Sequence, residues 1–333
     1  MQKLFGHKSS ISLSDSKYPL FSVLVANYNR APYLKEALES ILSQDYPNFE
    51  VVVVDDGSTD GSATIIQKLL EIEPRIKYFQ SPVNEGCGAA MRKCVSHASG
   101  VWMVLHGSDD VMLPGAISSL VQAHKLHPEC SVINSTHYVC DENLNIQRLA
   151  YGAMAIPHNE NYLSFGKGIT GLASFPRSFY ILTDGINADY KRAVDQDFYY
   201  KMEEVGRVFF IDKPLCKYRV NTSGISTIKN ISKARYWFAR AKEEAYQRRL
   251  TKPTVKNISQ SELNAWWSVV FITKSSEKFR QGKICAGFFW LGKSFGKSIF
   301  DRYLVLKVES FFLNSYPHWV FKKLKQVWKK KPY

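Results

Sequence analysis

The sequence lacks any apolar run of the ~18–20 residues that a membrane-spanning helix needs. Its best candidates, residues 265–273 and 284–291, are too short. The N-terminal residues are polar and contain no apolar core of signal-peptide length. The six cysteines include no C-x-x-C pair, which argues against a zinc site and is typical of a reducing compartment. These absences together predict a cytoplasmic protein.

A dinucleotide-binding fingerprint is missing as well. The motif G-x-G-x-x-G belongs in the first turn between a strand and a helix. The first such turn here reads ANYNRAP and contains no glycine. Gly86 and Gly88 have the right spacing further on, but Met91 stands where the third glycine would belong. The sequence therefore argues against NAD binding.

The sequence does have ample apolar content and a strongly uneven charge. Hydrophobic residues make up 45% of the 333 residues, which is enough for a packed core. Residues 229–333 hold 23 basic and 6 acidic side chains, whereas residues 1–228 hold 21 basic and 24 acidic ones. A near-neutral body thus precedes a basic C-terminal third, which indicates an anionic partner such as a membrane surface or a nucleic acid.

Apolar strands and amphipathic helices alternate in the first 110 residues. We expect strands at 21–25, 49–54, 76–82 and 101–110, and helices at 31–44, 62–73 and 88–99. Four consecutive valines at 51–54 suit a strand that is covered on both faces, as in a parallel sheet. The alternation predicts an open α/β sheet, in which ligands bind beyond the carboxyl ends of the strands.

Three of these strand ends carry polar clusters, namely Asn27-Tyr28-Asn29, Asp55-Asp56 and Ser108-Asp109-Asp110. We expect all three to line one site. Neighbouring carboxylates repel each other unless a cation lies between them, and Mg²⁺ is typically held by one or two carboxylates plus substrate phosphates. Asp109 and Asp110 could therefore bind a metal, or they could form a turn and cap the helix that begins near Pro114. The same two interpretations apply to Asp55 and Asp56.

The remaining chain is less regular. A helix and a strand are expected up to about residue 136, and residues 137–190 show no clear pattern. Residues 193–206 predict a helix that opens with Asp195 and Asp197, and two short strands are expected around Lys213-Pro214. Beyond residue 229 the pattern is helical and basic, with six of the seven tryptophans.

Five segments resemble the family 2 glycosyltransferases in their order and spacing: SVLVANYNR, FEVVVVDDGSTDGS, NEGCGAAMRKCVSHASG, GSDDVMLPG, and AVDQDFYYKM followed by FFIDKPLCKYRVN. The resemblance covers roughly residues 20–228. It implies the GT-A fold, a Rossmann-like nucleotide half joined to an acceptor half. It also implies transfer of a sugar from a nucleotide-sugar, usually UDP-linked, with inversion at the anomeric carbon. The implied organisation is a flexible leader (1–18), a GT-A domain (19–228) and a basic, aromatic-rich helical extension (229–333).

The resemblance also implies roles for the strand-end residues. The turn from Ala26 to Tyr28 would hold uracil, with Tyr28 stacking on the base. Asp56 would accept a hydrogen bond from the base, and Asp55 would support the turn. The other implied nucleotide-binding residues are Asn84 and Gly86 beside the nucleotide, Ser108 near the ribose, and Arg219 near the diphosphate.

Two further aspartates match family positions that take part in the reaction. Asp109 matches the aspartate that binds Mg²⁺ or Mn²⁺, and Asp195 matches the catalytic base. The sequence departs from the family pattern close to each of these aspartates. Gly107 replaces the first aspartate of the usual D-x-D motif. Val194 replaces the glutamate that usually precedes the base, so Asp197 could share its role.

The expected function is that of a metal-dependent hexosyltransferase acting in cell-surface polysaccharide, O-antigen or glycolipid assembly, on a glycan or lipid-linked acceptor. Because of the Gly107 and Val194 departures, a catalytically weak nucleotide-binding scaffold is the alternative. The last residues, HWVFKKLKQVWKKKPY, are basic and aromatic, as in segments that lie on anionic membranes. Residues 229–333 could therefore hold the protein on the inner face of the cell membrane, or simply pack on the catalytic domain. No nucleic-acid-binding motif is present, so we expect no nucleic-acid partner.

Overall fold

The structure is a computed structural model, and it describes residues 17–165, 168–221 and 231–295. Within these residues the chain forms a mixed sheet of nine strands in the order β3-β2-β1-β4-β8-β6-β9-β5, with β7 paired to β6. The strands are β1 (Phe21–Asn27), β2 (Phe49–Asp55), β3 (Ile76–Gln80), β4 (Trp102–Gly107), β5 (Val111–Met112), β6 (Cys130–Cys140), β7 (Ile146–Leu149), β8 (Ala173–Pro176) and β9 (Arg207–Arg219).

Parallel strands build the N-terminal half of the sheet. β1 lies between β2 and β4 and is parallel to both, and β3 pairs with β2 in the same direction. Alternate residues point to opposite faces, and both faces are buried. Val51 and Val53 belong to one core, whereas Val52 and Val54 belong to the other. The valine run therefore forms a strand covered on both sides, as the sequence predicted.

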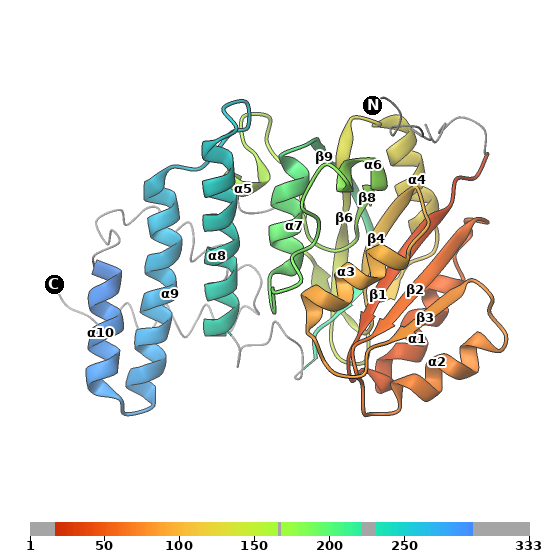
Figure 1. Cartoon of the computed structure of the whole chain (residues 1–333), viewed down its shortest axis with the longest axis horizontal. Helices are drawn as coiled ribbons and strands as arrows, with labels where there is room; N and C mark the ends of the chain where they lie inside the picture. The colour runs from red at the N-terminus through yellow and green to blue at the C-terminus, as the bar shows by residue number, and fades with distance from the viewer. Residues whose placement is uncertain (1–16, 166–167, 222–230, 296–333) are drawn as a thin grey trace, which may run out of the picture.

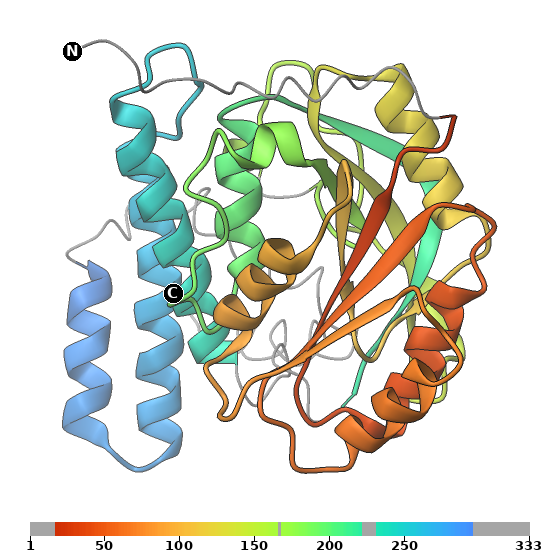
Figure 2. The same cartoon turned by 45° about the vertical axis from the view of Figure 1, so that its right-hand side comes forward.

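Helices supply the cover on each face. Apolar side chains of α1 (Ala31–Leu42), α2 (Ser62–Leu70) and α4 (Ala116–Leu126) join the first core, and those of α3 (Cys87–His97) and α7 (Val194–Glu203) join the second. Figure 2 shows α3 and α7 on one side of the parallel strands and α1 and α2 on the other. The loops that follow β1, β2 and β4 consequently emerge between these two layers, at one edge of the sheet.

The second half of the sheet is mixed. β8 runs antiparallel to β4 and to β6, while β9 is parallel to β6 and antiparallel to β5. Residues 137–190, which had no clear sequence pattern, supply the end of β6, then β7, α5 (Tyr162–Phe165), β8 and α6 (Arg177–Tyr180).

The prediction of two short strands around Lys213-Pro214 was wrong, because one continuous strand, β9, passes through both residues. The pairing of β9 with β6 shifts register where Pro214 faces Thr136. Proline has no N–H to donate, and an irregular position of this kind is where a strand tolerates it.

Three long helices follow the sheet. α8 (Ile231–Leu250), α9 (Gln260–Arg280) and α10 (Ile284–Phe295) lie side by side beyond α7, with α10 outermost (Figure 1). Ala241 and Ala245 of α8 and Leu263 of α9 belong to the second core, so the first of these helices are joined to the sheet domain. α9 begins with a capping box formed by Ser259 and Glu262.

Across the described ranges, no helix has the length and apolar character required to cross a membrane. Three sequence predictions concern residues outside those ranges: nearly all of the leader (1–18), the domain boundary at 228–229, and the basic stretch 318–333.

Candidate active site

The sheet register brings the three polar clusters together. Asn27 at the end of β1 pairs with Asp55 at the end of β2, and Ala26 pairs with Gly107 at the end of β4. Because the strands are parallel, their carboxyl ends share one edge. We use the name strand-end site for the residues gathered there: Ala26 to Asn29, Asp55 and Asp56, Asn84 to Gly86, and Ser108 to Asp110.

Asp55 is buried and supports the turn after β2. Its Oδ1 accepts hydrogen bonds from Asn27 Nδ2 at 3.3 Å and from the Ser58 backbone N–H at 3.2 Å, and the Ser58 hydroxyl also donates to it. The Tyr78 hydroxyl lies 3.4 Å from Oδ2. Burial, together with the Asp55 charge, raises the pKa of Tyr78 to about 12. These contacts fit the turn-supporting role implied by the family resemblance.

Asp56 ties the turn after β2 to the loop that follows β3. Its Oδ1 accepts the Glu85 N–H at 2.9 Å, and its Oδ2 accepts the Gly86 N–H at 2.7 Å. Gly57, next to it, has φ +75°, and a Cβ there would lie 2.7 Å from the backbone of Val83. Only glycine fits this close approach. The Asp56 carboxylate thus fixes the loop that is predicted to border the nucleotide.

Tyr28 and Asn84 are accessible to a nucleotide, whereas Asp56, which was expected to accept a hydrogen bond from the base, is buried. The exposed fraction of Tyr28 is 45%, and Asn84 is exposed as well. Asn29 next to Tyr28 has φ +51°, and its backbone N–H donates to the Ser58 hydroxyl at 2.9 Å. The turn that carries Tyr28 is therefore held in place while its aromatic ring remains open to a stacking partner.

Asp109 is engaged by two side chains that the sequence analysis did not assign to the site. Its Oδ2 accepts hydrogen bonds from Arg30 Nε at 3.1 Å and from Asn221 Nδ2 at 2.7 Å. Arg30 directly follows the first polar cluster, and this cation at a strand end was the signal that could have identified it. Ser108, the preceding residue, is buried.

Asp110 has the more unusual environment of the pair. Its Oδ1 accepts the Arg219 backbone N–H at 2.8 Å. Burial and the neighbouring Asp109 charge raise the pKa of Asp110 to about 8. A Cβ on Gly107 would lie 2.5 Å from Asp110 Oδ2. The Asp110 carboxylate therefore occupies the space in which the first side chain of a D-x-D motif would begin, which accounts for the glycine at position 107.

Arg219 fastens the turn that carries these aspartates. Its Nε donates to the Asp109 carbonyl oxygen at 2.7 Å, and its Nη2 forms an ion pair with Glu36 of α1 at 2.6 Å. Its Nη1 donates to the Glu142 carbonyl oxygen, and its guanidinium lies over the Tyr33 ring at 4.7 Å. The side chain is buried, so its direct role is to position the Asp109 turn.

The residues present fit a divalent cation held jointly with substrate phosphates. Among the described residues, no group of three or more His, Cys, Asp or Glu side chains gathers into a metal site. Mg²⁺ and Mn²⁺ sites with phosphate ligands do not need one, because one or two carboxylates suffice. Asp109 and Asp110 form a mutually repelling pair that a cation would stabilise. Asp109 would be the residue to hold such a cation, in exchange for its contact with Arg30.

Asp195 approaches the same site from the acceptor side. It lies in the first turn of α7, and Gln196 Nε2 donates to its Oδ2 at 3.4 Å. Burial raises the pKa of Asp195. Cys87 at the start of α3 lies within the electrostatic influence of both Asp195 and Asp56, and its pKa is raised to about 12, chiefly by burial. The structure thus brings Asp195 towards the nucleotide loop.

Asp197, the alternative base, has different contacts. Its side chain is completely buried and forms ion pairs with Lys201 Nζ at 2.8 Å and with Arg248 Nη1 at 3.4 Å. The Asp197 carboxylate is paired with two cationic side chains inside the protein. The contacts of Asp197 are therefore those of a structural ion pair.

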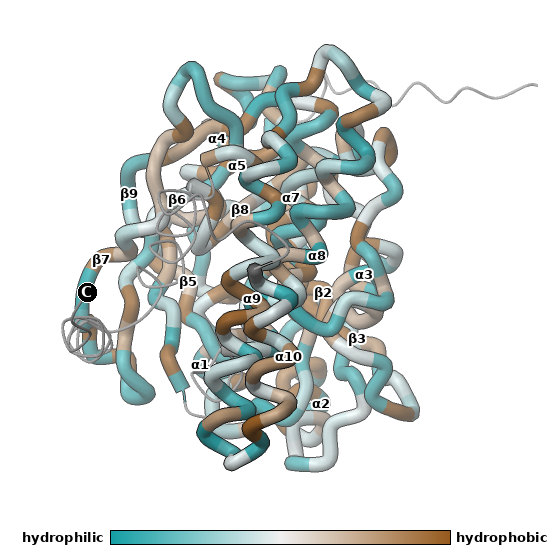
Figure 3. Tube along the Cα trace, turned by 90° about the vertical axis from the view of Figure 1, so that its left-hand side faces the viewer, coloured by the Kyte–Doolittle hydropathy of each residue, from teal (hydrophilic) through white to brown (hydrophobic). Residues whose placement is uncertain are grey.

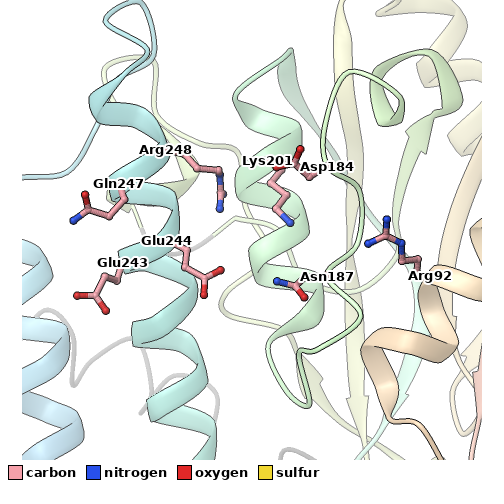
Figure 4. Close-up of a pocket in the computed structure, with 8 residues that line it drawn as sticks. All are labelled: Arg92, Asp184, Asn187, Lys201, Glu243, Glu244, Gln247 and Arg248. Carbon is pink, nitrogen blue, oxygen red and sulfur yellow. The ribbon is translucent and has the colours of Figure 1, made fainter.

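A hollow of about 460 Å³ lies next to that ion-pair cluster, between α7 and α8 (Figure 4). Side chains from four parts of the chain line it: Arg92, Asp184, Asn187, Lys201, Glu243, Glu244, Gln247 and Arg248. Its lining carries three cations and three carboxylates and contains none of the predicted site residues. The hollow is therefore separate from the strand-end site.

The acceptor-side chain is locked against α3. The Gly88 N–H donates to the Tyr190 carbonyl oxygen at 3.1 Å, and a Cβ on Gly88 would come within 2.7 Å of that oxygen. Lys191 Nζ donates to the Glu85 carbonyl oxygen at 2.6 Å. Gly88 was not part of a dinucleotide motif; its lack of a side chain permits this close contact.

The parallel strands, their antiparallel continuation and the carboxylates at one edge define a mixed α/β sheet of the GT-A type, followed by the helices α8–α10. Residues 22–182 match the family model described as Glycosyl transferase family 2. The chain therefore contains a family 2 glycosyltransferase domain, as the sequence motifs predicted.

The similarity to curated relatives covers most of this chain but only part of each relative. A chondroitin synthase of Pasteurella multocida (strain Pm70) is 28% identical over 235 residues, which cover 68% of this chain and 23% of that protein. A chondroitin synthase of Escherichia coli is 28% identical over 215 residues, 65% of this chain and 31% of the relative. The matched part thus spans a quarter to a third of these relatives.

Solved structures share the fold at low identity. The mannosyltransferase PcManGT from Pyrobaculum calidifontis, in complex with GDP-Man and Mn²⁺, has a TM-score of 0.55 and 18% identity, covering 94% of this chain and 88% of that one. Residues 1–349 of S. aureus TarS, in complex with UDP-GlcNAc, have a TM-score of 0.56 and 18% identity, covering 84% and 93%.

Proposed function

We propose that the chain is an inverting hexosyltransferase that moves a sugar from a UDP-linked donor to a hydroxyl group of a glycan or lipid-linked acceptor. The observation that carries the proposal is the meeting of the Asp56 turn and the Asp109-Asp110 turn at the ends of parallel strands. Asp195, at the start of α7, influences Cys87 together with Asp56, which supports a place for it near the same loop. In this proposal residues 19–228 are the transferase domain, residues 229–333 are an extension, and the enzyme works at the cytoplasmic side of the membrane.

The similar proteins support the substrate classes. The chondroitin synthases favour a role in polysaccharide assembly. TarS bound to UDP-GlcNAc favours a UDP-linked donor, whereas PcManGT bound to GDP-Man shows that a related fold accepts another nucleotide. O-antigen or glycolipid assembly would use the same chemistry on a different acceptor.

The chain's own residues would bind and orient the donor. Tyr28 offers an exposed ring for stacking on the base, and Asp56 holds the loop at Gly86 that borders the nucleotide. Arg219 fixes the turn that presents Asp109 to the diphosphate. A bound Mg²⁺ or Mn²⁺ would offset the negative charge on the departing diphosphate.

Asp195 would act as the general base. It removes a proton from the acceptor hydroxyl as that oxygen attacks the anomeric carbon on the face opposite the diphosphate, so one displacement inverts the configuration. Burial raises the pKa of Asp195, which makes it a stronger proton acceptor than an exposed aspartate. Activity should consequently rise with pH as this carboxyl loses its proton.

Replacement of Asp195 tests the base. We expect Asp195→Asn to lower turnover of the preferred UDP-sugar about 10³-fold, the scale of general-base catalysis. Affinity for UDP should not change. Asp189→Asn, an exposed aspartate on the segment before α7, is the matched control and should retain wild-type turnover. Equal turnover in wild type and Asp195→Asn would exclude this base.

Nucleotide titration tests the alternative of a weakly catalytic scaffold. Calorimetry with UDP and GDP, each with and without Mn²⁺, should show UDP binding that requires Mn²⁺ and is lost in Asp109→Asn. Tight nucleotide binding without turnover of any donor would favour the scaffold. Absence of metal-dependent nucleotide binding would mean that the Asp109 turn is only structural, and the enzyme proposal would then be wrong.

A further inference from the structure

The outermost described helix, α10, points its apolar side chains away from the protein. The exposed fractions are 61% for Ile284, 62% for Phe288 and 57% for Phe289, and Cys285 is exposed as well. These four positions follow the spacing of one helix face. We call them the α10 outer face.

The opposite side of α10 shows why this orientation is fixed. Gly287 packs against α9, and a Cβ there would lie 2.5 Å from the Phe279 ring. The Ser275 hydroxyl donates to the Gly287 carbonyl oxygen at 2.8 Å, and Ser294 is buried against Ser268. Gly287, Ser294 and Trp290, which stacks on Phe271, thus face α9, while Phe288 and Phe289 face outward. An ordinary surface helix of a water-soluble protein buries such phenylalanines.

Cations lie at both ends of the α10 outer face, with exposed Lys283 directly before Ile284 and Lys293 beside Phe289. From residue 271 to residue 295 the chain holds five Lys or Arg and one acidic residue, Glu277. Lys274 Nζ lies 4.5 Å from the centre of the Trp290 ring, and Lys293 Nζ lies 5.0 Å from that of Phe289. Figure 3 shows brown, apolar positions on α9 and α10 on the side of the molecule that carries these helices. Aromatic and cationic groups therefore share one surface.

We propose that the α10 outer face docks on an anionic lipid surface, with the helix lying in the plane of the interface. The described part of α10 has 12 residues, and exposed Phe and Ile beside Lys are the groups that interfacial helices use. The apolar rings enter the acyl boundary while the cations contact anionic headgroups. A symmetric pair of α10 faces would instead bring two cationic clusters together, which is unfavourable. This inference does not depend on the transferase activity.

Flotation with lipid vesicles tests the docking surface on the full-length protein. Vesicles of phosphatidylcholine with phosphatidylglycerol should bind the protein, and vesicles of phosphatidylcholine alone should bind it weakly. We expect Phe288→Ser combined with Phe289→Ser to lower binding more than about ten-fold, because two aromatic side chains that would enter the acyl boundary are lost. Lys283→Gln should lower it about five-fold.

A matched control uses another exposed apolar pair. Ile181 and Leu182, at the end of α6, have exposed fractions of 71% and 64%. The double change Ile181→Ser and Leu182→Ser should leave vesicle binding at the wild-type level. Equal losses in both double variants would show that binding follows general exposed hydrophobicity, and would overturn the assignment to α10.

Cys285 provides a second measurement without any substitution. It is the only one of the six cysteines whose side chain is exposed, and it lies on the α10 outer face. An environment-sensitive fluorophore attached there should shift to shorter wavelength with anionic vesicles and not with neutral ones. Vesicle binding without this shift would assign the contact to residues 296–333, which add nine basic and two acidic residues, and would overturn the proposal. A shift that follows protein concentration without lipid would overturn it in favour of a second copy.

Discussion

The two aspartate pairs of the strand-end site have the same sequence and different surroundings. Asp55 and Asp56 receive hydrogen bonds from neutral groups, chiefly backbone N–H groups and the Ser58 and Asn27 side chains. Asp109 is paired with Arg30, whereas Asp110 is crowded by Asp109, and its pKa is raised to about 8. The first pair is held by neutral donors, whereas in the second pair an arginine faces one carboxylate and the other carboxyl keeps its proton. The same two residues in sequence therefore have different environments, and only the second pair changes its charge when a proton is lost near neutral pH.

Replacing Asp109 should have the largest effect of the changes considered. This effect should be on turnover and not on stability. We expect Asp109→Asn to lower donor turnover about 10³-fold, because the carboxylate that would hold the catalytic cation is lost. Folding should be nearly unaffected, since Asn can still receive a hydrogen bond from Arg30. Turnover and urea unfolding of the same preparations check this. A large loss of stability with turnover preserved would make this pair structural, like Asp55-Asp56.

Restoring the family's first aspartate should be harmful. In Gly107→Asp the new Cβ would come within 2.5 Å of Asp110 Oδ2, so we expect the free energy of unfolding to fall by about 3 kcal/mol. The cycle of Gly107→Ala, Asp110→Ala and the double variant measures the coupling. The double variant should lose less than the sum of the single variants. Simple additivity would show that Asp110 does not occupy this space.

The variant Asp56→Asn should lower the free energy of unfolding. Asn at this position has one oxygen for two backbone N–H groups, and its NH₂ would face one of them, so unfolding should become easier by about 2 kcal/mol. Amide hydrogen exchange at Glu85 and Gly86 should rise in parallel. Unchanged exchange at these amides would mean that the loop does not depend on the carboxylate.

The smallest expected effect is the contribution of Asp110 to the pH dependence of stability. The folded carboxyl keeps its proton up to about pH 8, whereas an unfolded aspartate loses it near pH ~3.9. The unfolded state therefore binds fewer protons between these values, and the free energy of unfolding falls as the pH rises. Between pH 6 and pH 7 we expect a loss of about 1 kcal/mol, absent in Asp110→Asn. Urea unfolding at both pH values, with Asp189→Asn as control, checks this.

The sequence predicted the parallel strands because their signal is local. The valine run, the helical spacing of Leu34, Leu38 and Ile41, and the polar residue at each strand end are visible within a few positions. The parallel register then places the clusters together without further information. Residues 137–190 gave no such signal, because β8 is only four residues long and exists through its pairing with β4 and β6.

The contacts within the site were less predictable than its position. Arg30 reaches Asp109 across 79 positions, and Asn221 reaches the same atom across 112. Asp197 was a candidate base from the sequence. The structure shows that its charge is paired with Lys201 and with Arg248, which comes from the distant helix α8. Local pattern identifies which residues carry charge, but the partner of each charge is set by tertiary packing.

The contact at Gly88 has a mechanical consequence. The acceptor-side segment touches α3 with no side chain between them, and Lys191 joins it to the Glu85 loop. The backbone of α3 and the segment before α7 therefore touch directly, with no side chain between them to adjust their spacing. Gly88→Ala would place a methyl group within 2.7 Å of the Tyr190 carbonyl oxygen and should push these two backbones apart. Because α7 follows this segment directly, we expect such a change to alter the position of α7 as well as the stability of the protein.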